Sequence, residues 1–401
     1  MEEKEPNTSA RLENWPGCFL KILHVVGDLS LESGGLAVAV RGLAAAQAQL
    51  GHQASILSTD YKWTGSDRKV NGMELHFSAC EWPLWRWSGE FNRLALTLIE
   101  CADIVHLHAL WDYPVLAAAR ICKKLNKPFV LTAHGMMDRW SMAQKSWKKK
   151  FYLKFVAPPI LQGARAIHFT SDQERECSRL ENFHGKIFVS AFGIPDSAME
   201  QLPSALALGQ RFPDLKSRRI ILFLGRLHYK KNPDVLIDAF AKITGEHPDV
   251  CLVIVGSGDK SYVSGLYNRV SRLKLNQSVY FKGMLNRDAV QEAYRAAEIF
   301  VSPSFQENFG FSIMEAMASG CPVVVGETVD YASQIAQNRA GLLCSPTPKS
   351  VAEALETLLQ NPTLRREMGQ RGRQFVIEGF GWPAAANRFI AFYESLLQSS
   401  Y

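Results

Sequence analysis

Residues 303–325, PSFQENFGFSIMEAMASGCPVVV, form the stretch around which the rest of this chain can be understood. Apolar side chains at helical spacing predict a helix over 311–319, and Gly320 is placed to end that helix as its C-cap. The β-branched run 323–325 is typical of a strand buried in a parallel sheet. The stretch therefore predicts a loop, a helix and a buried strand in that order.

The start of this predicted helix has the chemistry of an anion-binding site. The first N–H groups of a helix lack partners and carry the positive end of its dipole, and Gly310 lets a ligand approach the backbone. Glu307 could accept hydrogen bonds from hydroxyl groups, and Glu315 lies about a turn and a half inside the helix. A nucleotide sugar, with a central diphosphate and hydroxyls at both ends, would fit. The alternative is an acidic residue that stabilises a helix dipole, with Glu315 on a solvated face.

The whole run resembles the signature of glycosyltransferase family 4, the group 1 glycosyl transferases, which are retaining enzymes with the two-domain GT-B fold. The residues in register are Glu307, Phe309-Gly310, Glu315-Ala316, Ser319-Gly320 and Pro322-Val323-Val324. Asn308 departs from the commoner Gly or Ser, a change that we expect to be tolerated. The resemblance implies that Glu307 contacts the donor sugar in catalysis and that Glu315 contacts the nucleotide ribose. The donor-binding residues that it implies between them are Asn308, Phe309, Gly310, Phe311 and Ser312, whose N–H groups from Phe309 onward hold phosphate.

Composition and charge are those of a globular protein with two ordinary domains. The chain has 401 residues, of which 47% are hydrophobic and 21% charged, and a formal net charge of +6. That charge permits anionic ligands or an anionic membrane surface but does not require nucleic acid, which we do not expect as a partner. No run of about 18 apolar residues occurs, and the acidic residues 1–17 are unlike a signal peptide. The eight cysteines form no C-x-x-C pair, which favours reduced thiols in a cytoplasmic protein.

The first predicted strand and the loop after it have the layout of a phosphate-binding turn. Residues 19–26 predict a buried strand, Gly34 and Gly35 follow in a loop, and the Ala-rich residues 36–50 predict a helix. A flexible turn is an equally open interpretation of two glycines. The family resemblance implies that this Gly-Gly loop binds the donor diphosphate.

Histidines lie on or directly after the next predicted strands. Strand alternation in 103–108 places His106 and His108 on one face, which could suit a metal. Because no third or fourth ligand is evident nearby, a packing or loop-anchoring role is favoured. The strand 128–133 ends at His134, and ligands gather at the carboxyl ends of strands in doubly wound sheets. The resemblance implies a catalytic contact of His134 with the donor sugar, and the alternative is a structural histidine.

Residues 60–90 show no regular pattern and contain Trp63, Trp82, Trp85 and Trp87. Aromatic side chains accompany many sugar sites, but tryptophans also fill protein cores. This stretch stays unassigned, with contact to the acceptor as a hypothesis.

Residues 139–156, RWSMAQKSWKKKFYLKFV, hold six cations and no acid. On one predicted helix, the residues that share an apolar half are Trp147, Phe151, Tyr152, Phe155 and Val156. Lys150 and Lys154 lie opposite, but Lys148 falls inside the apolar sector. One interpretation is a helix that lies on an anionic membrane surface. The other is an ordinary helix that packs its aromatic side chains inward.

The second half of the chain restarts the strand–loop–helix pattern. Residues 219–224 predict a strand that ends at Gly225-Arg226, and Lys231 follows five residues after the arginine. The two cations would lie at the mouth of a sheet and could pair with a diphosphate. The resemblance implies that Arg226 and Lys231 neutralise the departing diphosphate, although Lys230 could substitute.

The predicted fold class is α/β of the GT-B type, with two Rossmann-like doubly wound parallel-sheet domains that face each other across a cleft. The hinge is placed at 192–195. The predicted parts are a leader over 1–18, an acceptor-side domain over 19–193, a nucleotide-sugar-binding domain over 194–380, and a C-terminal helix over 381–401 that crosses back to the first domain.

The predicted function is a retaining hexosyltransferase that uses a UDP- or GDP-linked sugar and a hydroxyl of a sugar, glycan or glycolipid acceptor, in cell-envelope polysaccharide or glycolipid biosynthesis. Because the chain has no D-x-D motif, neither a metal nor another cofactor is expected. Alternatives on the same fold are a phosphorylase, a sugar-phosphate or sucrose-type synthase, and a non-catalytic nucleotide-sugar-binding protein. The expected location is the cytoplasm, with peripheral contact at the inner face of the cell membrane through 139–156.

Overall fold

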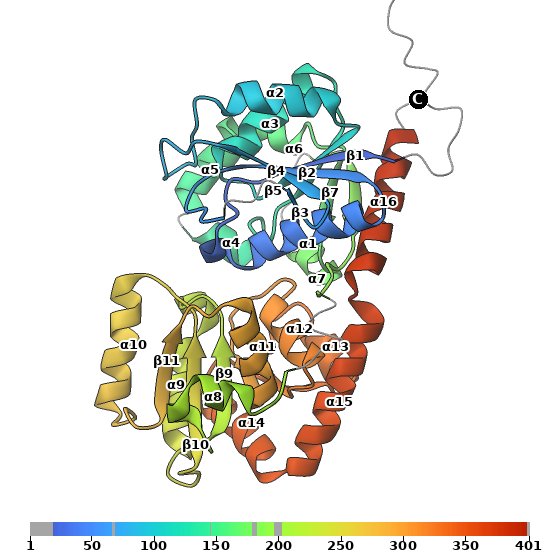
Figure 1. The fold of residues 1–401 in the computed structure, drawn as a ribbon. Helices are drawn as coiled ribbons and strands as arrows, with labels where there is room; N and C mark the ends of the chain where they lie inside the picture. Colours follow the sequence, from blue (N-terminus) through green and yellow to red (C-terminus); the bar gives the residue numbers. More distant parts are fainter. Residues whose placement is uncertain (1–18, 66–68, 145, 179–182, 196–202, 399–401) are drawn as a thin grey trace, which may run out of the picture.

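The computed structural model describes residues 19–65, 69–144, 146–178, 183–195 and 203–398, which form two α/β units, one above the other in Figure 1. Each unit is built on a largely parallel sheet that helices cover. The prediction of two doubly wound α/β units is therefore confirmed. The predicted leader lies outside the described residues, and the domain bounds stay predictions.

The first sheet has eight strands in the order β3-β4-β2-β1-β5-β6-β7-β8. They are β1 Lys21–Val25, β2 Gln53–Thr59, β3 Lys69–Val70, β4 Met73–Ser78, β5 Ile104–His108, β6 Phe129–Thr132, β7 Ala166–Phe169 and β8 Lys186–Val189. β3 runs antiparallel to β4, and the other neighbours pair in parallel. Helical crossovers make parallel pairing possible and cover the central strands, so β5, β6 and β7 are buried along their whole length.

The helices of the first unit connect these strands. They are η2 Leu31–Ser33, α1 Gly35–Gln49, α2 Phe91–Cys101, α3 Tyr113–Lys124, α4 Arg139–Ala143, α5 Ser146–Phe155, α6 Pro158–Leu161 and α7 Asp172–Cys177. α7 begins at a cap in which the Ser171 side chain accepts from the backbone N–H of Glu174.

β3 and β4 lie in the stretch 60–90, which the sequence analysis leaves irregular, and that interpretation is wrong for these residues. β4 pairs in parallel with β2 and extends the sheet at its edge. Its pattern escapes detection because buried Met73 and Leu75 alternate with exposed or half-buried polar residues in only six positions. Trp63 of this stretch stacks on Phe77, with ring centroids 4.9 Å apart.

The second sheet has six strands, all parallel, in the order β11-β10-β9-β12-β13-β14. They are β9 Arg219–Leu224, β10 Val250–Val255, β11 Val279–Gly283, β12 Ala297–Ser302, β13 Val323–Gly326 and β14 Gly341–Cys344. The helices are α8 Ala207–Arg211, η4 Pro213–Leu215, η5 Tyr229–Lys231, α9 Pro233–Ile243, α10 Lys260–Arg272, α11 Arg287–Ala296, α12 Phe311–Ala318, α13 Ala332–Gln337, α14 Pro348–Gln360, α15 Pro362–Gly379 and α16 Trp382–Gln398. The sequence analysis predicts two of these strands, over 219–224 and 323–325, to within a residue because each is a compact apolar run.

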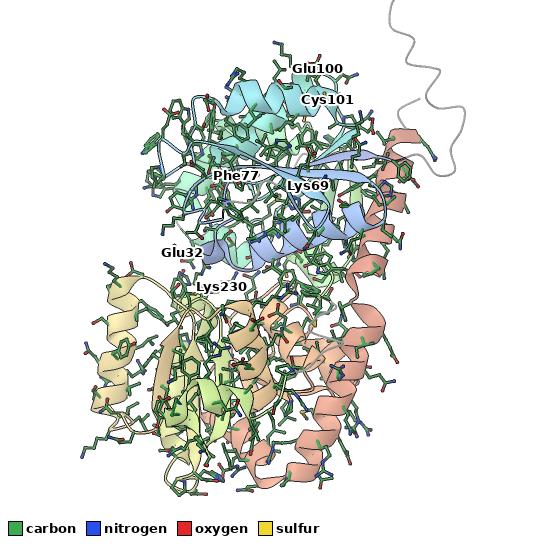
Figure 2. The ribbon with its side chains drawn as sticks, viewed as in Figure 1. Glu32, Lys69, Phe77, Glu100, Cys101 and Lys230 are labelled. Carbon is green, nitrogen blue, oxygen red and sulfur yellow. The ribbon has the colours of Figure 1, made fainter. Side chains whose placement is uncertain are left out.

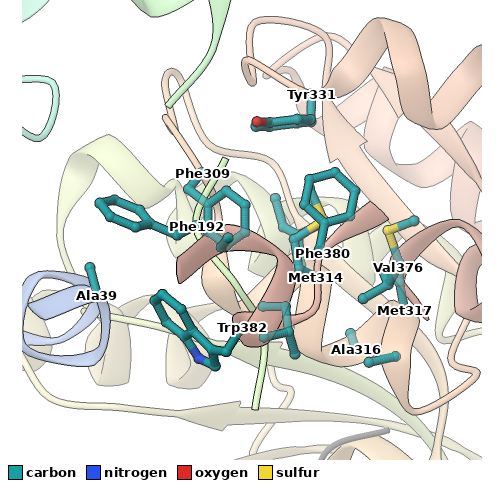
Figure 3. Packing of buried hydrophobic residues seen from close by; sticks show 14 of the residues in the cluster. Ala39, Phe192, Phe309, Met314, Ala316, Met317, Tyr331, Val376, Phe380 and Trp382 are labelled. Atoms are coloured by element: carbon teal, nitrogen blue, oxygen red, sulfur yellow. The ribbon is translucent and has the colours of Figure 1, made fainter. Parts of the chain in front are cut away.

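The last helix, α16, runs from the second unit back along the first and packs against α1 (Figure 1). α1 presents Gly42 to Trp382, and a Cβ built at Gly42 would lie 2.1 Å from the indole, so a larger residue would separate the two helices. Aromatic side chains from both units meet beside this contact, including Phe192, Phe309 and Phe380 (Figure 3). This shared core joins the two units where they face each other.

The basic stretch 139–156 is two helices, α4 and α5, so the interpretation as one helix with one apolar half is wrong. In α5, Tyr152 packs on Trp111 and donates its hydroxyl proton to the Leu110 carbonyl. The outward-facing aromatic side chains of α5 are Trp147, Phe151 and Phe155, which are 71%, 60% and 62% exposed. The apolar residues are therefore divided between an outward face and an inward face, and Tyr152, Leu153 and Val156 are the ones that pack against the core.

Candidate active site

A cavity of about 590 Å³ lies between the two units, a size common for small-molecule sites. Glu32 of the first unit and Lys230 of the second, both labelled in Figure 2, line it from facing edges. All twelve residues that the sequence analysis selects line this cavity, and they are Gly34, Gly35, His134, Arg226, Lys231, Glu307, Asn308, Phe309, Gly310, Phe311, Ser312 and Glu315. The fold brings the selected residues together, and their individual roles stay predictions.

The N-terminus of α12 forms the centre of the second unit's wall. Gly310 has a φ of 67°, in the left-handed region that favours glycine, and turns the chain into the helix. The N–H groups of Phe311 and Ser312, at the first helical positions, have no acceptor within the helix and belong to cavity-lining residues. The wall therefore offers the donors and the dipole end that bind a phosphate.

Glu307 and Lys231 form an ion pair at the edge of this wall. Burial, with Lys230 and Arg226 nearby, lowers the pKa of Lys231 to about 7, and the Glu307 carboxylate acts in the opposite direction. Burial also lowers the pKa of Lys230. A ligand with hydroxyls and a phosphate could replace this ion pair, because its hydroxyls would bind Glu307 and its phosphate would bind Lys231.

Glu315 lies deeper in the cavity and accepts a 3.0 Å hydrogen bond from the hydroxyl of Tyr294. Burial raises the pKa of Glu315 to about 7, so its carboxyl exchanges a proton near neutral pH. Tyr294 on α11 is a supporting residue that the sequence analysis misses, because nothing in the local pattern links it to a glutamate 21 positions away.

His134 lies just after β6, with Ala133 between them, and has a φ of 51°. Its ring stacks on Phe192 at 5.7 Å, and its Nε2 atom lies 3.1 Å from Nδ1 of His108. Burial, with His168 nearby, lowers the pKa of His134 to about 3, so the ring is neutral at pH 7. The ring can therefore exchange hydrogen bonds with a substrate without bringing a charge.

The loops of the two units touch across the cavity at two glycines. A Cβ at Gly35 would lie 3.3 Å from the Phe311 ring. A Cβ at Gly135, which has a φ of 71°, would lie 2.0 Å from the side-chain oxygen of Asn308. Glycine at these positions therefore allows the first unit to approach the α12 motif closely.

Several polar residues of the first unit's wall were not selected from the sequence. Arg86 forms an ion pair with Asp28 at 3.4 Å, and its guanidinium group lies 4.0 Å from the centre of the Tyr61 ring. Asp112 lies in the same wall, and burial raises the pKa of its carboxyl. Asp28 and Asp112 lie a few residues after the ends of β1 and β5. Because ligands bind at the carboxyl ends of parallel strands, this position in the sequence could have identified both residues. The predicted acceptor contact of Trp63, Trp82, Trp85 and Trp87 stays untested, and none of the four is among the described residues that line the cavity.

Two hydrogen bonds beside the cavity link the units directly. The Ser171 hydroxyl donates to the Asp330 carboxyl at 2.6 Å, and the Tyr331 hydroxyl donates to the Thr170 carbonyl at 2.6 Å. Burial raises the pKa of Asp330 to about 7. These contacts hold the units in the arrangement that forms the cavity.

A cluster of three buried histidines lies behind His134. One ring nitrogen from each of His24, His106 and His108 lies within 4.8 Å of the other two, which is a spacing that a metal could use. The sequence analysis finds no third candidate ligand for the pair on β5, and β1 supplies one, because the register aligns His24 with His106. The seven cysteines in the described part of the chain are free thiols.

Two family models match the chain. The model described as Glycosyl transferases group 1 matches residues 210–375, and the model described as Glycosyl transferase 4-like domain matches residues 34–184. The chain therefore belongs to the group 1 glycosyl transferases, and it is a glycosyltransferase enzyme.

Similar proteins agree with this assignment. The chain is 25% identical over 388 residues to an uncharacterized glycosyltransferase of Methanocaldococcus jannaschii. The aligned residues cover 91% of this chain and 95% of that protein. It is 28% identical over 259 residues to a D-inositol 3-phosphate glycosyltransferase of Kineococcus radiotolerans. The aligned residues cover 60% of this chain and 59% of that protein. The crystal structure of HepE from Anabaena, solved with UDP and glucose, superposes with a TM-score of 0.76 at 17% identity, covering 94% and 100%. The fold is GT-B, as predicted.

Proposed function

We propose that the enzyme transfers a hexose from a UDP- or GDP-linked sugar to an acceptor hydroxyl with retention of configuration. The observation that carries the proposal is one cavity in which the open N-terminus of α12, the cations Arg226 and Lys231, and the carboxylate of Glu307 face the same space. These groups match a diphosphate joined to a sugar, because donors and cations suit phosphate and the carboxylate suits hydroxyls. HepE, which shares the fold, was solved with UDP and glucose.

In the proposed mechanism, the bond between the sugar's anomeric carbon and the diphosphate oxygen breaks, and its electron pair stays on that oxygen. Arg226, Lys231 and the α12 N–H groups stabilise the resulting negative charge. The acceptor oxygen forms the new bond to the anomeric carbon on the same face, and its proton passes to the departing phosphate. Because Glu307 is paired with Lys231, it is better suited to accept hydrogen bonds from sugar hydroxyls than to act as a covalent nucleophile.

Thermal shift against UDP, GDP and ADP, each free and linked to a sugar, tests the donor assignment. A ligand that binds only the folded chain raises the melting temperature. We expect stabilisation by one base series, lost in Arg226→Ala and kept in Arg366→Ala, an exposed arginine outside the cavity. An Arg226→Ala enzyme with full affinity and activity would contradict the proposal.

The acceptor decides between the proposed transferase and a phosphorylase or sugar-phosphate synthase on the same fold. Product analysis with phosphate, free sugars, sugar phosphates, glycans and glycolipids as acceptors separates these classes. We expect transfer to a cell-envelope glycan or glycolipid. Turnover with phosphate or a small sugar phosphate alone would favour the alternative, and nucleotide binding without transfer to any acceptor would favour a non-catalytic protein.

Peripheral membrane contact through α5 is part of the proposal. Among the described helices, none is long and apolar enough to cross a membrane. On α5 the exposed aromatic side chains lie four residues apart beside exposed lysines, a combination that suits an anionic membrane surface; they are Trp147, Phe151 and Phe155 with Lys148, Lys150 and Lys154. Binding at this surface would place the cavity beside a lipid-linked acceptor.

Sedimentation with vesicles that contain an anionic lipid tests this contact. We expect salt-sensitive binding that Trp147→Ala weakens, while Trp82→Ala, which changes an exposed tryptophan elsewhere on the first unit, leaves it intact. Equal binding by both variants, or no binding at low salt, would contradict the membrane role.

A further inference from the structure

Behind His134, a chain of buried polar side chains crosses the core of the first unit. In order, its members are Ser190, His168, Thr132, His106, Tyr393, Gln47, His24 and His108. Burial lowers the pKa of the four histidines, to about 4 for His24 and His168 and well below the usual value for the other two. The rings are therefore neutral at pH 7, and each has one nitrogen that donates and one that accepts.

The direction of the hydrogen bonds is determined at one end by the carbonyl oxygen of Ser190, which can only accept. Nε2 of His168 lies 2.8 Å from that oxygen and donates, so Nδ1 of His168 accepts from the Thr132 hydroxyl at 2.9 Å. The Thr132 oxygen in turn accepts from Nε2 of His106 at 2.7 Å. Nδ1 of His106 must then accept from the Tyr393 hydroxyl, which lies 2.6 Å away.

Gln47 on α1 determines the direction of the second part of the network. Its amide oxygen lies 2.7 Å from Nε2 of His24 and can only accept, so Nε2 of His24 donates. The Gln47 amide N–H group lies beside the Tyr393 hydroxyl but is buried without a hydrogen-bond partner among the described residues. Tyr393 and Gln47 are therefore where the two parts of the network meet.

The chain ends at the cavity. Nδ1 of His24 accepts from Nε2 of His108 at 2.9 Å, and Nδ1 of His108 accepts from Nε2 of His134 at 3.1 Å. His134 thus has its proton on Nε2, and Nδ1, the other ring nitrogen of this cavity-lining residue, is left as an acceptor. We propose that this network is a set of positioning residues that holds His134 in the Nε2–H tautomer and offers Nδ1 to a hydroxyl of the bound sugar.

The same geometry accounts for the three clustered histidines without an ion. Every ring nitrogen of His24, His106 and His108 has a protein partner at 2.6 to 3.1 Å. A metal would have to replace several of these hydrogen bonds, and the outer nitrogens are committed to Gln47, Thr132 and Tyr393. The hydrogen-bond network therefore explains the buried histidines of this unit better than a metal site does, since the ring nitrogens have hydrogen-bond partners within the protein.

The tautomer of His134 can be measured on the ligand-free chain. Histidine ¹⁵N and ¹³C shifts in the full-length, isotope-labelled protein distinguish the two tautomers, and the His134→Gln variant identifies the signal. We expect the Nε2–H form, unchanged between pH 6 and 8. The Nδ1–H form, or a protonated ring at pH 7, would overturn the proposal whatever happens to any other variant.

Removal of one distant hydroxyl tests whether the network positions the ring. Tyr393→Phe keeps the ring packing but removes the hydroxyl that bonds to His106 and lies beside the Gln47 amide, so the amide can turn over and the opposite tautomer becomes accessible. We expect mixed His134 tautomers and a kcat/KM about tenfold lower. Tyr152→Phe, which also loses one hydroxyl hydrogen bond in the first unit, is the control and should change neither.

Three results separate the possible failures. If Tyr393→Phe matches Tyr152→Phe in both tautomer and kinetics, the network does not position His134. If the purified chain retains a stoichiometric metal that His24→Gln releases, the cluster is a metal site and the proposal is wrong. The role toward a sugar hydroxyl rests on the proposed function, so absent turnover with every nucleotide sugar would refute that function, while the tautomer measurement would still decide the network.

Discussion

The two walls of the cavity are built in opposite ways. The second unit's wall comes mainly from one continuous stretch, 307–315, in which carboxylates, a glycine and a helix N-terminus are neighbours in the chain. The first unit's wall combines most of the stretch 32–38 with residues from separate loops, namely Asp28, Arg86, Asp112 and His134. The second unit's wall can be predicted from the sequence because it depends on local backbone geometry. The first unit's wall depends more on the order and register of its strands, which bring separate residues together.

The largest expected effect comes from Glu307→Gln in the continuous wall. We expect kcat to fall by about 100-fold or more, because the neutral amide binds sugar hydroxyls less strongly and leaves Lys231 without its ion pair. Steady-state kinetics with a saturating donor measures this loss. The control is Glu353→Gln on the exposed face of α14, which should keep full activity. Near-normal turnover in Glu307→Gln would mean that this wall does not hold the reacting sugar.

Gly135→Ala tests the point where the two walls touch. The φ of 71° disfavours alanine, and the new Cβ would meet the side chain of Asn308. We expect a loss of about 1 to 3 kcal/mol in the free energy of unfolding, measured in urea. Combining it with Asn308→Gly should recover the part that comes from the collision. Strictly additive effects of the two changes would show that the walls do not meet here.

The pH dependence of Asp330→Asn tests the contact beside the walls. Burial raises the pKa of Asp330 to about 7. The hydrogen bond from Ser171 and the charge of Lys230 oppose this shift, and Glu174 and Asp138 add to it. The folded chain thus holds this proton more tightly than the unfolded chain, whose carboxyl has a pKa near 3.8, so its contribution to stability is lost as pH rises from about 4 to 7. We expect the variant to exceed the wild type by on the order of 2 kcal/mol at pH 7.5 and to match it near pH 4. Parallel stability curves would contradict the raised pKa.

The smallest effect is expected from Asn308→Ser, which restores a residue common in the family pattern. The side-chain nitrogen of Asn308 is buried without a hydrogen-bond partner among the described residues, so little is lost on its removal. We expect kcat/KM to change by less than about threefold. A loss comparable to that of Glu307→Gln would give Asn308 a direct role in the second wall.

Prediction from the sequence succeeds for elements whose signal is continuous. The predicted strand 219–224 agrees with β9, and the predicted strand 323–325 agrees with β13 to within one residue, because each is a compact apolar run. β4 is missed because a strand of only six residues with alternating polarity has no such run. The division of α5 into inward Tyr152 and outward Trp147 is also missed, because a helical projection does not say which face another element covers.

The sequence by itself determined the α/β class, the nucleotide-sugar-type motif at 307–315 and the cations after β9, because each depends on residues a few positions apart. Only the tertiary structure decided that Glu307 pairs with Lys231 and that Tyr294 supports Glu315. It alone also connected His134 through His108 and His24 to Gln47 on α1. The physical reason is that a buried polar group must find its partner in space, and the partner's distance along the chain has no bearing on that requirement.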